Sequence, residues 1–354
     1  TYPTYKQNIP KDMSREVLLA PALDDYTDSV CHRFSPKRFH SRKEQNMKKE
    51  YENFVEYLRQ AMMTALGMDE NQIFFAQGEK GTPFEEDKLF IQCAKQGEAC
   101  ELCGMHTQDA YKKYKEGVSL DEIVGGMVQA IGRIEEAGYL GKVLEAADYE
   151  KARDKLFIRL VNIEKNKLEL RNAIYKSIGD IALVLYLRVE ETKERLTSIK
   201  IRKEFVEGWK QDREQVFADA LLNTYYLAPP RIYRWEELIY DLEYEGDNFM
   251  DVLAQYELRK DAMGNCLSTT KRTNGAVAVF LPGVAQRLAY LLGGSFYMVF
   301  TSIHEVMIHI DTMVDPKDLQ HVLQNTIEEA TPAEDVLTCK IYHYNKDTEC
   351  FTSV

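Results

Sequence analysis

The chain has 354 residues, of which 45% are hydrophobic and 29% are charged, as in an ordinary globular protein. This length is enough for one to three domains. The net charge of −12 disfavours general nucleic-acid binding, because phosphate contacts need clustered cations. No apolar run approaches the roughly 20 residues that a transmembrane helix needs.

Seven cysteines are scattered along the chain, an odd number that argues against a disulfide scaffold and fits a reducing compartment. The first four residues, Thr1-Tyr2-Pro3-Thr4, lack the basic-then-apolar layout of a secretory signal peptide. We therefore expect a cytoplasmic protein.

Residues 1–43 are predicted to form an extended basic arm, because prolines interrupt them and no periodicity is sustained. At the end of the arm, the patch 31–49 carries seven Lys and Arg against one Glu. Its Phe and His side chains could stack on bases while its cations contact phosphates. The alternative is a solvated tail whose aromatic side chains lie against an acidic body.

An N-terminal α+β domain is predicted over residues 44–150. A capping box at Ser41 and Glu44 precedes apolar residues spaced by three and four, which predicts one long helix that ends near Gly67. The remaining pattern predicts short strands over 72–76, 88–93 and 99–106, then helices over 108–117 and from 119 onward.

A C-terminal α+β domain is predicted over residues 151–354. Its first part should contain strands over 155–162, 180–190 and 196–202 and helices over 164–173 and 204–227. Residues 231–273 are interpreted as an acidic, irregular covering segment with one short helix over 249–256. A strand-helix-hairpin-helix-hairpin unit should follow: a strand over 276–281, a helix over 284–292, strands on either side of 302–305, a helix over 315–329, and a hairpin of 335–344 with 349–352. The chain as a whole is therefore predicted to be α+β, with mixed or antiparallel sheets flanked by helices.

His304 and Glu305 form the first candidate site, at a predicted reversal between two strands. A His with a carboxylate partner can act as a general base, because pairing tunes its pKa toward neutrality. No Gly-x-Ser-x-Gly nucleophile motif accompanies the two residues. The structural alternative is that both side chains satisfy backbone groups of the turn and pin the hairpin.

A second candidate site combines three cysteines and a histidine: Cys93, Cys100, Cys103 and His106. Thiolates and an imidazole at short spacing can hold a tetrahedral zinc ion. The pattern has only one Cys-x-x-Cys pair, and a plain strand that carries small buried thiols explains it equally. Since phosphate-binding glycine loops are also absent from the sequence, no cofactor is expected.

The stretch 235–247 alternates acidic with aromatic residues. It is interpreted as a covering segment with a solvated acidic face. The alternatives are a cation site or a docking surface for a basic partner.

Three pieces of the chain resemble an uncharacterised family of bacterial proteins found in gut Firmicutes, known only as a domain of unknown function. They are 111–117, the run from 160–166 to 220–224, and the run from 281–283 through 302–305 to 341–344. A fainter similarity, over the middle third, is to YtpQ-like uncharacterised proteins. The resemblance implies a bacterial cytoplasmic setting and supplies no activity.

The leading hypothesis is a non-enzymatic binding or adaptor module with a protein partner, because no set of residues has the type and spacing that chemistry requires. One alternative is a hydrolase-like or ligand-processing enzyme centred on His304 and Glu305. Another is a nucleic-acid-associated protein that uses the arm residues 31–49.

Overall fold

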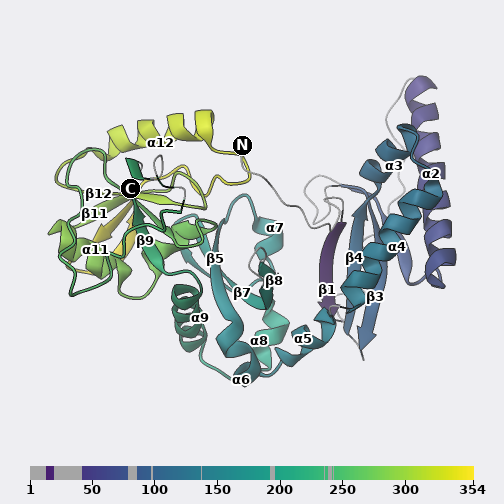
Figure 1. The fold of residues 1–354 in the computed structure, drawn as a ribbon, viewed down its shortest axis with the longest axis horizontal. Coiled ribbons are helices and arrows are strands. Elements are labelled where there is room, and N and C mark those ends of the chain that lie inside the picture. The colour runs from purple at the N-terminus through teal and green to yellow at the C-terminus, as the bar shows by residue number, and fades with distance from the viewer. Residues whose placement is uncertain are drawn as a thin grey trace. The chain divides into compact units, whose positions relative to one another are not determined.

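The structure, a computed structural model, describes residues 13–19, 42–78, 86–96, 99–136, 138–191, 196–234, 236–237, 241 and 243–354. It divides the chain into two compact units, Thr1–Leu144 (unit 1) and Glu145–Val354 (unit 2), both shown in Figure 1. The sequence predicts a boundary at 150/151, a few residues later.

Unit 1 is a four-stranded antiparallel sheet with helices on one face (Figure 1). The strand order is β1-β4-β3-β2, with β1 at Met13–Leu19, β2 at Ile73–Ala76, β3 at Lys88–Gln96 and β4 at Ala99–His106. The helices are α2 (Arg42–Leu66), α3 (Thr107–Lys115) and α4 (Leu120–Glu136). Helix α2 forms because Phe54, Leu58 and Met62 recur on one face, where all three are buried against α4 and the sheet.

Part of the predicted arm is a strand. Residues 13–19 form β1, which pairs antiparallel with β4 from Met13 opposite Met105 to Leu19 opposite Ala99. Residues 1–12 and 20–41, which include the patch 31–49 up to 41, lie outside the described residues, and residues 42 and 43 begin α2.

Unit 2 begins with a small helical segment and a four-stranded sheet. Helix α5 (Tyr139–Glu145) crosses the boundary, and α6 (Tyr149–Ala152) and η1 (Arg153–Lys155) follow it. The sheet consists of β5 (Leu156–Asn162), β6 (Tyr175–Ile178), β7 (Ile181–Glu191) and β8 (Leu196–Lys200), with β7 paired to the other three. Short helices α7 (Lys167–Leu170) and α8 (Lys203–Glu207) and the longer α9 (Arg213–Leu227) complete this part.

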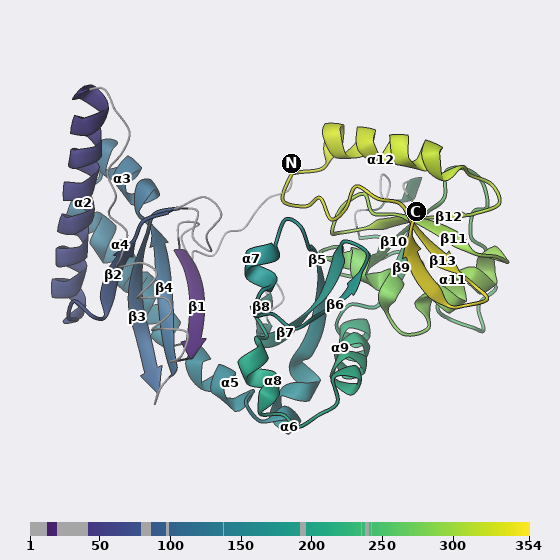
Figure 2. The same cartoon turned by 180° about the vertical axis from the view of Figure 1, so that it is seen from behind.

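A six-stranded antiparallel sheet forms the rest of unit 2 (Figures 1 and 2). Its order is β14-β13-β11-β12-β10-β9, from β9 (Pro230–Tyr233), β10 (Asn265–Thr269), β11 (Phe296–Val299), β12 (Val306–Ile310), β13 (Tyr342–Asn345) and β14 (Cys350–Ser353). Helix α12 (Pro316–Ala330) packs Leu319 and Leu323 against one face. The other elements of this part are η2 (Gly275–Phe280) and α11 (Val284–Leu292). Strand β9 starts with Pro230 at the sheet edge. Proline is tolerated there because the N–H that it lacks would not be needed for a hydrogen bond to a neighbouring strand.

The predicted α+β class is confirmed, and every pair of neighbouring strands among the described residues is antiparallel. Several predicted elements are wrong. The predicted strand over 276–281 is replaced by the 3₁₀ helix η2, which ends at Phe280. Residues 249–256 are irregular rather than helical. The segment 231–273 contains β9 and β10, and of 335–344 only the end is a strand.

Candidate functional site

His304 and Glu305 lie in the loop between β11 and β12, beside the middle of the six-stranded sheet. The loop is fixed by its backbone, because the Ile303 N–H donates to Asp335 and its carbonyl accepts from Ala276. Ser268 Oγ on β10 donates to the carbonyl of His304 at 2.7 Å. The sequence-predicted pair therefore stands on an ordered loop at a strand reversal, as expected.

Both ring nitrogens of His304 have partners. Nδ1 accepts the backbone N–H of Asn274 at 3.1 Å, and Nε2 lies 3.4 Å from Oδ1 of Asp335. This arrangement places the proton on Nε2 and uses the lone pair of Nδ1. A histidine held in this way has no nitrogen free to take a proton from a substrate.

Glu305 is similarly engaged. One carboxylate oxygen accepts from Thr301 Oγ1 at 3.0 Å, and the other accepts from the Cys266 thiol at 3.6 Å. Burial, reinforced by the Glu305 carboxylate, raises the pKa of Cys266. The thiol is therefore protonated at neutral pH and is a poor nucleophile.

The contacts of His304 connect β10, the turn before η2, the 301–305 loop and Asp335 in one polar cluster. Hydrogen bonds of this kind stabilise loops by satisfying polar groups that leave water on folding. Both the structural and the enzymatic alternatives for His304 and Glu305 stay predictions.

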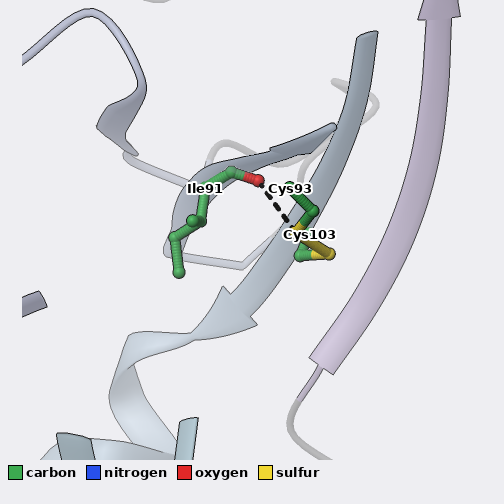
Figure 3. The surroundings of a disulfide bond; sticks show 3 residues. All are labelled: Ile91, Cys93 and Cys103. Carbon is green, nitrogen blue, oxygen red and sulfur yellow. Dashed lines mark hydrogen bonds between the residues drawn. A yellow bond between two sulfur atoms is a disulfide. The ribbon is translucent and has the colours of Figure 1, made fainter. Parts of the chain in front are cut away.

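The cysteine cluster lies in unit 1, where the structure joins Cys93 to Cys103 in a disulfide with Cα atoms 6.4 Å apart (Figure 3). A bulge between Gln92 and Ala94 brings Cys93 next to Cys103, whose register partner is Ile91. The odd, scattered cysteines did not predict this bond. His106 Nδ1 lies 2.7 Å from a carboxylate oxygen of Glu86.

A disulfide uses the two sulfur atoms that a zinc site would need as thiolates. The side chain of Cys100 lies outside the described part, and among the described side chains no three metal-binding groups lie together. The metal hypothesis for these residues stays a prediction. No helix in the described ranges is long and apolar enough to cross a membrane.

The acidic stretch of the sequence continues into the 243–257 loop, which holds five Asp and Glu and no Lys or Arg. The loop folds back on itself because Tyr244 and Tyr256 donate to the two carboxylate oxygens of Asp247, at 2.8 and 2.9 Å. Arg234 Nε lies 2.9 Å from the same carboxylate. Burial and Asp247 raise the pKa of Tyr256 to about 12, so its hydroxyl stays a donor at neutral pH.

The tip of this loop presents apolar side chains to solvent, which sequence reasoning missed. Val252 is 76% exposed and Leu253 is 91% exposed, and Tyr290 on α11 is 77% exposed. Two adjacent aliphatic residues in an acidic, turn-like stretch were the available signal, and the wrong helix predicted over 249–256 obscured it.

Arg287 on α11 forms two hydrogen bonds to the backbone of the loop immediately before its tip. Its Nε donates to the carbonyl of Phe249 and its Nη2 to the carbonyl of Asp251, both at 3.0 Å. Its guanidinium carbon lies 5.5 Å from the ring centre of Tyr290. Phe249 is fully buried, so the loop is anchored immediately before its exposed tip.

A His–Asp pair outside the predicted sites lies on the face of the six-stranded sheet that α12 covers. Nε2 of His343 on β13 lies 3.1 Å from Oδ2 of Asp311, and the ring packs 5.1 Å from Tyr297 on β11. Only the strand register brings these residues together, so no local sequence pattern could predict the pair.

A model of DUF5688, a family of unknown function, matches residues 51–346. The matched range contains all three pieces on which the resemblance to an uncharacterised family rests. No curated protein and no solved structure matches the chain. The bacterial origin and the fainter likeness to YtpQ-like proteins stay predictions.

Proposed function

The chain belongs to DUF5688, and we propose that it is a binding module that docks onto a partner protein through the 243–257 loop of unit 2. The observation that carries this proposal is the exposure of Val252 and Leu253 at 76% and 91% on a loop that the protein holds in place. Adjacent large apolar side chains at this exposure favour an interaction site.

Rigidity of the loop supports a docking role. The Asp247 contacts close its base, and the two Arg287 hydrogen bonds fix the residues on either side of Met250. Ordering a loop on binding costs free energy, so a loop ordered beforehand leaves more of the contact energy as affinity.

The charge around the tip defines the partner. Of the five acids in the loop, Asp247 is neutralised by Arg234, while Glu243, Glu245 and Glu257 form no ion pair with a described residue. We therefore expect a partner with an apolar pocket that takes Leu253 and a basic rim around it. The loop shares residues 243–247 with the stretch 235–247, for which a docking surface for a basic partner is one interpretation of the sequence.

A matched pair of valines tests the proposal. Val252→Glu and Val322→Glu place the same charge on exposed surfaces of unit 2, since Val322 on α12 is 58% exposed. Each tagged variant is used to capture partners from cells that express the protein, with quantification by mass spectrometry. We expect Val252→Glu to lose at least one basic protein that the wild type and Val322→Glu retain. The retained complex should also weaken as salt rises, because its rim is charged.

The proposal fails if Val252→Glu and Leu253→Asp capture the same set of proteins as the wild type. Thermal unfolding of each variant shows whether it is folded, and fully exposed positions should tolerate both substitutions within about 0.5 kcal/mol.

A further inference from the structure

Arg159 on β5 lies over two aromatic rings in the four-stranded sheet of unit 2. Its guanidinium carbon is 5.3 Å from the ring centre of Phe157 and 5.1 Å from that of Tyr186. Phe157 and Tyr186 are register partners on β5 and β7, and their ring centres are 5.9 Å apart. The strand pairing therefore sets the position of the guanidinium.

Three other arginines of unit 2 also lie over rings: Arg213, Arg272 and Arg287. Each of them donates to a backbone carbonyl oxygen as well. Arg159 has neither a hydrogen bond nor an ion pair to any described residue. Aromatic faces attract the positive charge but do not accept the in-plane N–H groups of a guanidinium.

The charge of Arg159 is only partly solvated. The residue is half-buried, and burial lowers its pKa. Tyr186 partly opposes that effect, and no carboxylate among the described residues does. A protein usually neutralises a cation that it withdraws from water, because an unpaired buried charge is costly. A guanidinium with unused donors and an uncompensated charge favours an oxyanion as its partner.

A small hollow adjoins the ring that Arg159 covers. It has a volume of about 170 Å³, and its walls include Phe157, Lys155, Arg188, Asp154, Tyr226 and Leu227. Sites for whole drug-sized ligands usually span roughly 300–1,000 Å³. The hollow therefore suits a small group rather than a complete organic cofactor.

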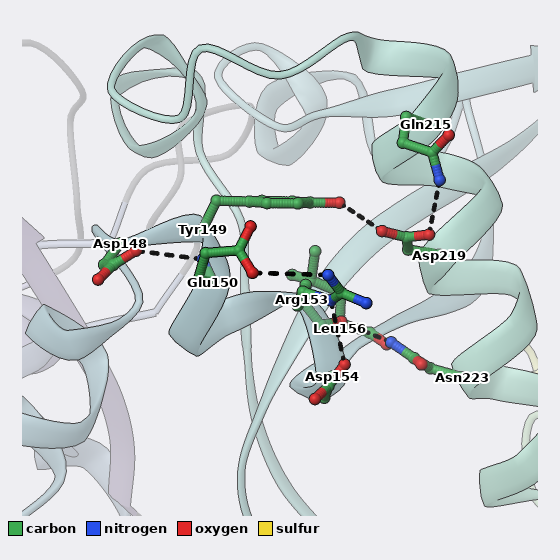
Figure 4. A network of polar contacts seen from close by, with 9 residues as sticks. All are labelled: Asp148, Tyr149, Glu150, Arg153, Asp154, Leu156, Gln215, Asp219 and Asn223. Carbon is green, nitrogen blue, oxygen red and sulfur yellow. Dashed lines mark hydrogen bonds and ion pairs between the residues drawn. The ribbon is translucent and has the colours of Figure 1, made fainter.

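The wall of the hollow is fixed by hydrogen bonds between α9 and the start of β5 (Figure 4). Asn223 on α9 donates to the carbonyls of Arg153 and Leu156, at 2.6 and 3.0 Å. Arg188 is paired with Glu191 at 2.7 Å, whereas Lys155 reaches Glu145 only at 3.9 Å. Lys155 is thus a cation in the wall of the hollow whose only ion pair among the described residues is long.

We propose that this face of β5 and β7 binds the phosphate group of a soluble phosphate monoester, with Arg159 as its anchor. A phosphate dianion matches the planar donor edge of Arg159, and Lys155 supplies a second cation in the wall of the hollow that adjoins Phe157. This site is independent of the 243–257 loop, so either can fail without the other.

Inorganic phosphate is the probe, titrated into the full chain at constant ionic strength with chloride as the balancing anion. Binding is followed by calorimetry and by the thermal midpoint, which a ligand of the folded state raises. We expect saturable binding to the wild type and to Arg213→Met, the matched arginine that covers a ring but has a carbonyl partner. Arg159→Met should weaken binding about tenfold or more, which is the loss of roughly 1.4 kcal/mol.

The proposal is overturned if the wild type shows no saturable response, or if Arg159→Met responds as the wild type does. Arg159 would then be a packing residue only. If Arg159→Met does not fold, the Nε–Hε resonance of Arg159 in the wild type decides: a saturable shift supports the site and an unchanged resonance rejects it. Phenyl phosphate and vesicles containing phosphatidic acid form two further arms, and a response to the vesicles alone would reject a soluble ligand.

Discussion

At the scale of single residues, His309 on β12 connects stability to pH. It is 6% exposed, its Nδ1 has no hydrogen-bond partner among the described groups, and Gly264 packs against the ring. Burial lowers its pKa, although the Ala262 carbonyl and Asp261 partly oppose this. An unfolded histidine binds a proton near pH 6.5, so the unfolded state gains protons first as pH falls. At pH values below about 6.5, the His309 contribution should therefore lower the free energy of unfolding, by at most about 1.4 kcal/mol per pH unit. At higher pH this contribution should be constant.

Urea unfolding of the wild type and of His309→Gln between neutral and mildly acidic pH measures this effect. The difference between the two free energies of unfolding isolates His309 from the other titrating groups. His321→Gln is the control, because His321 is exposed on α12 and its Nδ1–H donates to the helix carbonyl of Lys317. A wild-type slope that His309→Gln leaves unchanged would contradict the assignment.

The hydrogen-bond partners of His304 and Glu305 include residues far away in the sequence. The sequence correctly placed His304 and Glu305 at a strand reversal, from the apolar runs on either side. It could not show that Asn274 and Asp335 occupy the imidazole nitrogens, because these residues meet only after the sheet forms. Adjacent residue types suggest a reaction, and their tertiary partners determine whether it is available.

At the scale of elements, β13 is bound to the β6–β7 turn by the hydroxyl of Tyr342. The hydroxyl donates to the Asp180 carboxylate at 2.5 Å and accepts the Asp180 N–H at 3.0 Å. The substitution Tyr342→Phe removes this hydroxyl, so the carboxylate and the backbone N–H of Asp180 each lose one hydrogen-bond partner. The free energy of unfolding should therefore fall by about 1–3 kcal/mol. Chemical denaturation measures the change.

Tyr344, two residues along the same strand, is the matched control. It is also buried, but its hydroxyl has no hydrogen-bond partner within the described residues. Tyr344→Phe should leave stability unchanged or raise it, since an unsatisfied buried hydroxyl is removed. Equal losses from the two substitutions would mean that ring packing, and not the Asp180 contact, explains the effect.

The elements that the sequence mispredicted are those that lack periodicity. Residues 275–280 are buried on every side in η2, so their uniform apolar run could not distinguish a strand from a helix. Strand β10 (Asn-Cys-Leu-Ser-Thr) is a buried interior strand that contains polar residues. Its polar side chains Asn265 and Ser268 are accommodated because they donate hydrogen bonds to backbone carbonyls nearby. The amphipathic helices α2, α4 and α12 were predicted well, since each has one buried face and one exposed face.

At the scale of the whole molecule, the two units each have a core of their own. Helices α2 and α4 close the core of unit 1 over its sheet, and unit 2 contains separate apolar clusters under α7 and α12. A unit with its own core can fold alone. The fragment 145–354 should therefore unfold cooperatively by itself.

The contacts of the first residues of unit 2 allow an experiment that tests the boundary at 144/145 against the predicted boundary at 150/151. Trp209 Nε1 donates to the carbonyl of Ala146 at 2.8 Å, and Tyr149 donates to Asp219 on α9 at 2.7 Å (Figure 4). Tyr149 is buried, with its ring 5.4 Å from Trp209. A fragment that starts at 151 loses both contacts and leaves the indole N–H and Asp219 without these partners.

We expect the fragment 151–354 to be less stable than 145–354 by roughly 3 kcal/mol, the cost of deleting a large buried aromatic side chain. Urea midpoints of the two fragments measure the difference, and Tyr149→Ala in the longer fragment should reproduce most of it. Equal stability of the two fragments would place the boundary at 150/151 instead. The helices before β5 would then be a connection between units, whereas the contacts of Trp209 and Asp219 make them part of the unit 2 core.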